Sequence, residues 1–267
     1  MGYKITFGTL KGGTGKTTSA FSTAGILAER GYKVLLVDAD PQANLTSNLG
    51  IDETVDGYTS LLDLFENEKF DARKAIIKGY VKELPTLDII PSTIALTSTE
   101  MRIISLAGRE FLLKNHLKKQ ADVFDEYDYI IFDTNPSMSI INQNVFVLSD
   151  GIILTSEIGK NSLKGAELFI ALWEEICERM DKPNNILGFL INKYDSRTKL
   201  SREYMEYCSE YDVVKDLLFK TYIPDNVKVP EAEIENKPVN IAFKDATSSE
   251  AYKAFVNELL GRIGIRR

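Results

Sequence analysis

Cysteine and histidine are scarce in this sequence, and their scarcity excludes several kinds of site. The two cysteines, Cys177 and Cys208, lie far apart and lack the CxxC spacing of zinc or redox centres. We expect both to be reduced thiols. The one histidine, His116, sits in a lysine-rich helical stretch and is expected at the surface. Histidine-based catalytic triads and histidine clusters around a metal are therefore excluded.

Long apolar runs and an excess of basic charge are also absent. No stretch of about 18 uninterrupted apolar residues occurs, so no transmembrane helix is expected. The N-terminus does not have the pattern of a signal peptide. The net charge of −7 argues against a protein that coats nucleic acid over its whole surface, although a local basic patch remains possible. With 44 % hydrophobic and 27 % charged residues, the composition is that of an ordinary globular protein, expected in the cytoplasm.

Short apolar runs alternate with helical patterns along the whole chain. Runs typical of buried parallel strands cover residues 5–7, 33–38, 87–90, 129–133, 151–155 and 187–192. Helical patterns cover roughly residues 17–30, 98–122, 162–180, 201–210 and 248–263. This alternation predicts one α/β domain over residues 1–267, built on a doubly wound, mostly parallel sheet. Ligands of such sheets bind beyond the carboxyl ends of the strands, where we find Lys11, Asp38, Asp133 and Asn192.

A glycine-rich loop lies between the first predicted strand and the first predicted helix. Residues 8–18 read GTLKGGTGKTT, and this context is that of a phosphate-binding P-loop. Glycines let backbone N–H groups approach phosphate oxygens, and a helix N-terminus favours negative charge. Lys16 is expected on the β- and γ-phosphates, the Thr17 hydroxyl on Mg²⁺, and Thr18 near the α-phosphate. The residues predicted to bind the nucleotide here are Lys11, Gly12, Gly13, Thr14, Gly15, Lys16, Thr17 and Thr18.

Acidic residues end two of the predicted strands. In VDADPQ, residues 37–42, one of Asp38 and Asp40 can serve Mg²⁺ or the P-loop while the other faces the attacking water. The run YIIFD has the pattern of a Walker B strand, whose last residue, Asp133, would hold Mg²⁺ through water. The TNPS that follows, residues 134–137, is expected to be a switch loop that senses the γ-phosphate. ATP and Mg²⁺ are therefore the expected cofactors.

The loop departs from the general P-loop pattern at Leu10, where that pattern has glycine, but Lys11 followed by two glycines marks a variant. It resembles the deviant Walker A loop, KGGxGK[ST], of the ParA/MinD group of ATPases. By this resemblance, Lys11 reaches across a dimer interface to the partner's nucleotide and contributes to catalysis with Lys16. Further segments resemble the small, Soj-like ParA partition proteins over nearly the whole chain: VDADPQANLTSNLG, YIIFDTNPS, LDIIPST (87–93), NKYDSRTKLS (192–201) and IPDNVKVPEAEIENKPV (223–239).

This resemblance implies a P-loop NTPase fold of the SIMIBI type and assigns roles to single residues. Asp40 would position the water for hydrolysis, while Asp38 and Asp133 would serve the metal with Thr17. Asn192 and Pro224 would border the adenine. Two positions depart from the family. Asn135 stands where the switch loop usually has a proline, which leaves the hydrolysis rate open. Lys228 stands where the family has an arginine, so the charge survives and bidentate phosphate contact does not.

The resemblance also implies partners. An ATP-dependent homodimer would bind DNA nonspecifically and associate with the nucleoid, and a ParB-like centromere-binding protein would stimulate slow ATP hydrolysis. The DNA-binding candidates are Arg197, Lys199, Arg202 and Lys228, with Arg262, Arg266 and Arg267 as further ones. The large partition ATPases carry an N-terminal helix-turn-helix domain before the P-loop. None is expected here, so operator reading is not expected either.

Two alternatives remain. A MinD-like membrane switch needs a C-terminal amphipathic anchor, but Gly261 and Gly264 in the tail FVNELLGRIGIRR weaken a helix, and no membrane partner is expected. A metabolic enzyme on the same fold, such as a biotin-synthesis ligase or an iron–sulfur reductase, is the other. The reductase needs cluster-ligating cysteines, and neither Cys177 nor Cys208 lies near the switch loops.

Overall fold

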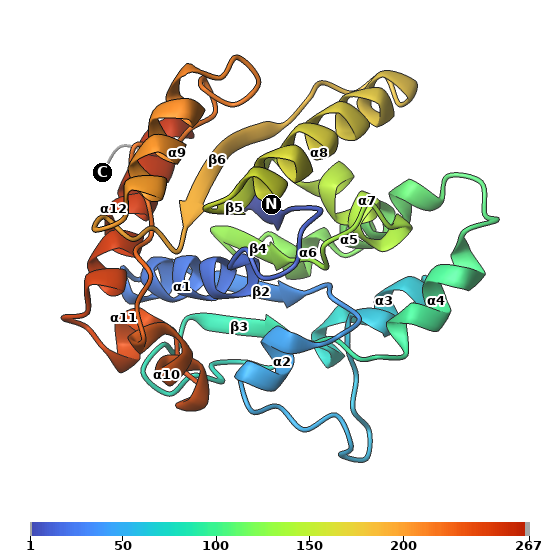
Figure 1. Ribbon diagram of the computed structural model, residues 1–267. Helices are drawn as coiled ribbons and strands as arrows, with labels where there is room; N and C mark the ends of the chain where they lie inside the picture. Colours follow the sequence, from blue (N-terminus) through green and yellow to red (C-terminus); the bar gives the residue numbers. More distant parts are fainter. Residues whose placement is uncertain (1, 265–267) are drawn as a thin grey trace.

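The computed structural model describes residues 2–264, which form one six-stranded sheet with helices on both faces (Figure 1). All neighbouring strands are parallel, in the order β3-β2-β4-β1-β5-β6. The strands are β1 Tyr3–Gly8, β2 Val34–Asp38, β3 Leu87–Ile90, β4 Tyr129–Asp133, β5 Gly151–Glu157 and β6 Ile186–Asn192. The chain builds one side of the sheet from β2 and β3 and the other from β5 and β6. The loop after β1 therefore opens near the point where the strand order reverses, the usual ligand site of such sheets.

The strands read as almost continuous apolar runs because both faces of the sheet are covered. Along β2, Val34 and Leu36 belong to the core on one face, and Leu35 and Val37 to the core on the other. In β4, all five residues are buried, including its last residue, Asp133. The doubly wound parallel sheet predicted from the sequence is confirmed.

Twelve α-helices lie within residues 2–264. They are α1 Lys16–Glu29, α2 Asn44–Asn48, α3 Leu61–Glu66, α4 Leu96–Ile103, α5 Leu112–Lys119, α6 Ala121–Phe124, α7 Ile140–Leu148, α8 Lys160–Arg179, α9 Lys199–Glu210, α10 Lys228–Ile234, α11 Val239–Ala242 and α12 Thr247–Arg262. Helices α1 to α8 connect the strands, and α9 to α12 follow β6. Short 3₁₀ turns cover Ala72–Lys74 and Arg109–Phe111. None of the helices in this part of the chain is long and apolar enough to cross a membrane.

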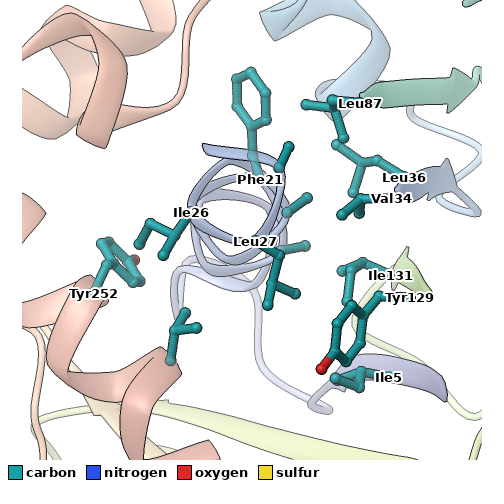
Figure 2. Packing of buried hydrophobic residues seen from close by; sticks show 14 of the residues in the cluster. Ile5, Phe21, Ile26, Leu27, Val34, Leu36, Leu87, Tyr129, Ile131 and Tyr252 are labelled. Atoms are coloured by element: carbon teal, nitrogen blue, oxygen red, sulfur yellow. The ribbon is translucent and has the colours of Figure 1, made fainter. Parts of the chain in front are cut away.

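Helix α1 carries the end of the P-loop and is held firmly between the sheet and α12. Figure 2 looks along α1, with Leu27 turned toward Tyr129 and Ile131 of β4 and Ile26 turned toward Tyr252 of α12. All five of these side chains are buried. Burying a large apolar side chain stabilises a fold by about 1.5–3 kcal/mol. The start of α1, where phosphate would bind, is therefore fixed by a packed core rather than by a mobile loop.

Two expectations about one region were wrong. The helical pattern over residues 98–122 is divided into α4, a 3₁₀ turn, α5 and α6, and Gly108, with a left-handed backbone of φ 68°, redirects the chain just before the 3₁₀ turn. His116 is 3 % exposed rather than at the surface, because it shares the inner face of α5 with Leu113 and Leu117. Its imidazole Nε2 lies 2.6 Å from the Gln120 side-chain amide. Burial lowers the pKa of His116.

The two cysteines agree with expectation. Cys177 and Cys208 are both free and buried among the described residues. Burial raises the pKa of each thiol, and that of Cys208 rises to about 11. A raised thiol pKa means little reactive thiolate near neutral pH. Both residues therefore pack as small apolar side chains.

Candidate nucleotide site

The loop between β1 and α1 turns on two glycines in the left-handed backbone region. Gly13 has φ 77° and Gly15 has φ 82°. A Cβ atom at Gly15 would also come within 2.8 Å of Nδ2 of Asn192, so space excludes a side chain there. Among the described residues, no side chain caps the start of α1, and its first turn carries no acidic residue. The N–H groups at this helix start are therefore available to an anion.

Lys16 is buried at the base of this loop, near carboxylates from two strand ends. It is 7 % exposed. Burial lowers the pKa of Lys16, and the nearby charges of Asp133 and Asp40 oppose that shift. In this position, the ammonium group of Lys16 can contact the oxygens of a phosphate bound by the loop.

Asp133, at the end of β4, is fully buried, and both of its carboxylate oxygens lack a hydrogen-bond partner within residues 2–264. It lies directly opposite Asp38 in the β2–β4 register. Burial raises the pKa of Asp133, and the charge of Lys16 opposes this shift. A buried carboxylate with open oxygens fits a hydrated divalent cation, because Mg²⁺ keeps its waters and needs oxygen acceptors around them. The residues present therefore fit Mg²⁺ at this end of the site.

Asp38 has a structural role that the sequence did not reveal. Its Oδ2 accepts hydrogen bonds from the backbone N–H of Thr46 at 2.9 Å and from the Thr46 hydroxyl at 2.7 Å. Its Oδ1 accepts one from the N–H of Asp40 at 3.0 Å. Burial, followed by the charge of Asp133, raises the pKa of Asp38. Asp38 thus fixes the loop after β2 and the start of α2, and its metal role stays a prediction.

Asp40 lies in this fixed loop and lines the cavity above the P-loop. Its Oδ1 accepts a hydrogen bond of 2.8 Å from the N–H of Gln42, and its carbonyl oxygen accepts one of 2.7 Å from the Ser92 hydroxyl. Burial raises the pKa of Asp40, while the bond from Gln42 and the charge of Lys16 oppose the shift. The side chain is held in place, with one carboxylate oxygen left for another donor.

The switch loop after β4 is held by a ring of hydrogen bonds around Asn135. The Asn142 amide of α7 donates to the carbonyl oxygens of Asn135 at 2.9 Å and Ser137 at 2.8 Å. The Ser137 hydroxyl donates to the Asn135 side chain at 2.7 Å. The Thr134 hydroxyl donates to the Phe7 carbonyl at 2.7 Å and ties the loop to β1. Side-chain hydrogen bonds thus give this loop the restraint that a proline at position 135 would have given.

These segments enclose a cavity of about 710 Å³, a typical size for a small-molecule site. It brings together the residues predicted to bind the nucleotide, with Lys11 as the exception: Gly12, Gly13, Thr14, Gly15, Lys16, Thr17, Thr18, Asp40, Asn192 and Pro224. Asp38 and Asp133 do not line it but lie buried beneath. Sequence reasoning missed other lining residues, which include Gln42, Asn44, Asn48, Lys193, Pro230, Glu233 and Tyr252. Most of them lie in the segments that resemble the ParA family, so this resemblance could have identified them.

Asn192 connects the far wall of the cavity to the P-loop. Its Nδ2 donates to the carbonyl oxygen of Thr14 at 2.7 Å and lies 3.2 Å from the Ser19 hydroxyl. Its Oδ1 is buried without a partner among the described residues. Pro224 lies close by, since its segment pairs with Tyr194 just after β6. Asn192 therefore joins this wall of the cavity directly to the phosphate loop.

Lys11 lies at the rim, turned away from the cavity. Its amine donates to Glu157 at the end of β5 and to the Ser162 hydroxyl at 3.1 Å. A second lysine, Lys193, donates to the carbonyl oxygen of Gly13 at 2.7 Å and lies 3.6 Å from the other Glu157 oxygen. We call Lys11, Glu157 and Lys193 the rim cluster. Lys11 and Lys193 hold the pKa of Glu157 below its usual value.

The basic residues predicted to bind DNA are mostly paired with acids of the same chain. Arg197 makes two parallel hydrogen bonds to Asp195, of 2.9 and 3.0 Å. Lys199 lies 3.0 Å from Glu203. Arg202 is exposed.

Lys228 pairs with Glu231 at 2.5 Å and lies over the ring of Phe243. The further candidate Arg262 serves a different purpose, because it donates to carbonyl oxygens of Leu217 at 2.8 Å and Leu218 at 2.5 Å. It ties the end of α12 to the segment before residue 219, so its donors are already used within the chain. Arg266 and Arg267 lie outside the described residues.

Comparisons with known proteins agree with this geometry. An AAA domain family model matches residues 2–187. The chain is 31 % identical to the chromosome-partitioning ATPase Soj of Treponema pallidum (strain Nichols) over 268 residues, which is 100 % of both chains. It is 33 % identical to the sporulation initiation inhibitor protein Soj of Bacillus subtilis (strain 168) over 259 residues, 97 % of this chain and 98 % of that one.

One solved structure is informative about the ligand. A cobyrinic acid a,c-diamide synthase from Mycobacterium smegmatis, with bound ATP analogue and magnesium, superposes with a TM-score of 0.81 at 25 % identity, covering 100 % of this chain and 98 % of that one. In this chain, the glycine loop and the open oxygens of Asp133 give the cavity groups that fit phosphate and a divalent cation. The chain belongs to the ParA/MinD-type P-loop ATPases.

Proposed function

We propose that this protein is a ParA-like partition ATPase that segregates plasmid or chromosomal DNA. In the ATP-bound state it forms a sandwich dimer, which binds DNA without regard to sequence. The position of Lys11 carries this proposal. Its amine lies at the rim and outside the cavity of its own chain, where a second copy can meet it. The end-to-end similarity to the Soj proteins supports the same function.

Within one subunit, buried residues would bind and hydrolyse the nucleotide. Lys16 contacts the β- and γ-phosphates, and the N–H groups at the start of α1 bind phosphate oxygens. Bound Mg²⁺ neutralises phosphate charge; Thr17, Asp133 and Asp38 would hold it. Asp40 orients the attacking water with its free carboxylate oxygen. Hydrolysis is slow without a partner.

DNA binding in this proposal depends on dimer formation. Exposed ion pairs such as those of Arg197 and Lys199 are weak because water competes for both charges, so phosphate groups can replace the acidic partners. One subunit offers few free cations, and two subunits present twice as many to one duplex. Binding should therefore be salt-sensitive and specific for the ATP state. A ParB-like centromere-binding protein then stimulates hydrolysis, which releases the dimer from the nucleoid.

The test is DNA binding measured with ATP, with ADP and without nucleotide, repeated with anionic lipid vesicles in place of DNA. Retention of DNA with ATP alone supports partition. Retention on vesicles and not on DNA would replace the proposal with a MinD-like membrane function. Arg202→Glu should weaken DNA retention, and Lys118→Glu on α5 is the matched control. Both residues are exposed, so neither change should alter ATP binding.

A second candidate function is a metabolic enzyme on the same fold. The similarity to the cobyrinic acid a,c-diamide synthase favours it, since that protein superposes on the whole chain with a TM-score of 0.81, although its identity of 25 % is below that of the Soj proteins. ATP consumption that requires a small organic acid, with no DNA or vesicle binding in any nucleotide state, would establish this alternative.

A further inference from the structure

A carboxylate on α10 faces the nucleotide cavity beside the end of the phosphate loop. Glu233 lines the cavity, and its Oε1 accepts a hydrogen bond of 2.8 Å from the Thr18 hydroxyl. Val229 and Pro230 of the same helix also line the cavity, so one face of α10 forms this wall. The hydrogen bond from Thr18 ties the Glu233 carboxylate to the third residue of α1. Glu233 therefore has a fixed place near the phosphate end.

No basic side chain forms an ion pair with Glu233 among residues 2–264. The two lysines nearest in sequence have other partners, because Lys228 pairs with Glu231 at 2.5 Å and Lys237 pairs with Glu83 at 2.6 Å. A negative charge without a counter-charge, in a cavity that takes a polyphosphate, opposes ligand binding by simple repulsion. A hydrogen-bond donor of the ligand that reaches this carboxylate would offset the repulsion.

The chemistry of a carboxylate limits what that contact can be. An ionised carboxylate accepts hydrogen bonds and donates none, so phosphate oxygens cannot be its partner. ATP carries donors in two places, the ribose hydroxyls and the exocyclic amine of adenine. In the proposed site, Thr18 lies near the α-phosphate, while Asn192 and Pro224 border the adenine. The group between them, next to Thr18, is the ribose.

We infer that Glu233 binds the ribose, with its carboxylate accepting a hydrogen bond from the 2′- or 3′-hydroxyl. This inference rests on the proposed nucleotide site and adds a residue that selects ribonucleotides over deoxyribonucleotides. The Thr18 hydroxyl orients Oε1, which leaves Oε2 free for the sugar, while the backbone N–H of Thr18 remains available to phosphate. An acidic side chain reads ribose hydroxyls in the same way in dinucleotide-binding folds.

The test compares equilibrium dissociation constants, not turnover, for ATP, 2′-deoxy-ATP, 3′-deoxy-ATP and inosine triphosphate, all with Mg²⁺. The wild-type protein should bind ATP about tenfold or more tightly than at least one deoxy analogue, because a hydrogen bond to a charged group is lost. In Glu233→Ala this preference should fall to about one. Glu233→Gln, which keeps the size of the side chain, should lie between the two. Glu235→Ala, an exposed residue at the end of the same helix, should bind like the wild type.

Several outcomes would overturn the inference. A Glu233→Ala protein that keeps the full sugar preference would remove Glu233 from the ribose site. Loss of discrimination against inosine triphosphate, with sugar preference unchanged, would place the carboxylate at the adenine amine instead. A wild-type protein that binds ATP tightly and both deoxy analogues equally well would overturn this inference alone. A wild-type protein that binds none of the four nucleotides would overturn the nucleotide site itself.

Discussion

Lys16 and Lys11 belong to the same short loop, yet they lie in opposite surroundings. Lys16 is 7 % exposed, lines the cavity and lies near the carboxylates of Asp133 and Asp40. The Lys11 side chain is 34 % exposed and pairs with Glu157 at the rim. We call Lys16 with Asp40 and Asp133 the floor of the cavity. The floor is fixed by contacts within one chain, whereas the contacts of the rim cluster are partly exposed and can be replaced by water or by a second copy. Removal of single groups from each region tests this difference.

The largest effect is expected at the floor, from Lys16→Ala. The variant loses a charged contact to phosphate from a buried lysine, so ATP should bind more than about a hundredfold more weakly. Isothermal titration calorimetry with ATP and Mg²⁺ measures this directly. Lys164→Ala, an exposed lysine of α8, is the control and should bind normally. Unchanged affinity in Lys16→Ala would remove the P-loop assignment.

Asp40→Ala should separate hydrolysis from binding. With no carboxylate to orient water, turnover should fall by about a hundredfold or more, while ATP affinity changes little. ATP-bound dimers should then accumulate, visible by size-exclusion chromatography with light scattering. Asp56→Ala, an exposed acid after the same strand, is the matched control. Normal turnover in Asp40→Ala would show that another group positions the water.

Asp133→Asn should stabilise the ligand-free protein and weaken its response to Mg²⁺. Burial raises the pKa of Asp133, so folding favours the protonated carboxyl. This contribution is complete below the usual carboxyl pKa and is lost as the pH rises through the raised one. Asparagine stays neutral at every pH and does not lose this stability. At a pH above the raised pKa of Asp133, the free energy of unfolding of the variant should therefore exceed that of the wild type by about 1 kcal/mol or more.

Denaturant unfolding of the two proteins at acidic and neutral pH, without nucleotide, measures this difference. The two curves should converge at acidic pH, where the wild-type carboxyl is also neutral. Addition of ATP with Mg²⁺ should raise the melting temperature of the wild type more than that of Asp133→Asn. A wild type that is the more stable of the two at neutral pH without ligand would show that Lys16 compensates the buried charge fully.

The floor could be predicted from the sequence because its chemistry is local. Glycines, Lys16 and Thr17 are neighbours along the chain, and a strand–loop–helix context is enough to aim their backbone N–H groups. The rim could not be predicted in this way. Glu157 reaches Lys11 only because β5 lies beside β1 in the sheet, and a spacing pattern carries no such information.

Two further outcomes, at His116 and Asn135, could not be predicted for the same reason: they depend on contacts outside the local motif. His116 has lysine neighbours in sequence, which suggested the surface, but the helical face that it shares with Leu113 and Leu117 decided its burial. Asn135 replaces the proline of the family, and the sequence left the effect of this change open. The amide of Asn142, one turn into the next helix, holds that loop instead. In each case a side chain outside the motif determined the outcome.

The smallest effect is expected at the rim, from Glu157→Gln. This change releases Lys11 from its ion pair, so the amine no longer has to leave a charged partner before it meets a second copy. A partly exposed pair of this kind contributes up to about 1 kcal/mol, and the proposed dimer releases one pair in each subunit, so it should form at a protein concentration up to about thirtyfold lower. Analytical ultracentrifugation with ATP and Mg²⁺ measures that concentration, and Glu206→Gln on the exposed face of α9 is the control.

Lys11→Ala in the same background decides between two explanations of such a gain. If Glu157 acts by holding Lys11, the double variant should lose the gain and dimerise as poorly as Lys11→Ala alone, because the two effects are coupled through one contact. Additive effects would mean that Glu157 influences the dimer independently of Lys11. A Glu157→Gln protein that dimerises more weakly than the wild type would show that this carboxylate contributes to the interface itself. The rim cluster would then be part of the dimer contact, and Lys11 would exchange one glutamate for another when the second copy arrives.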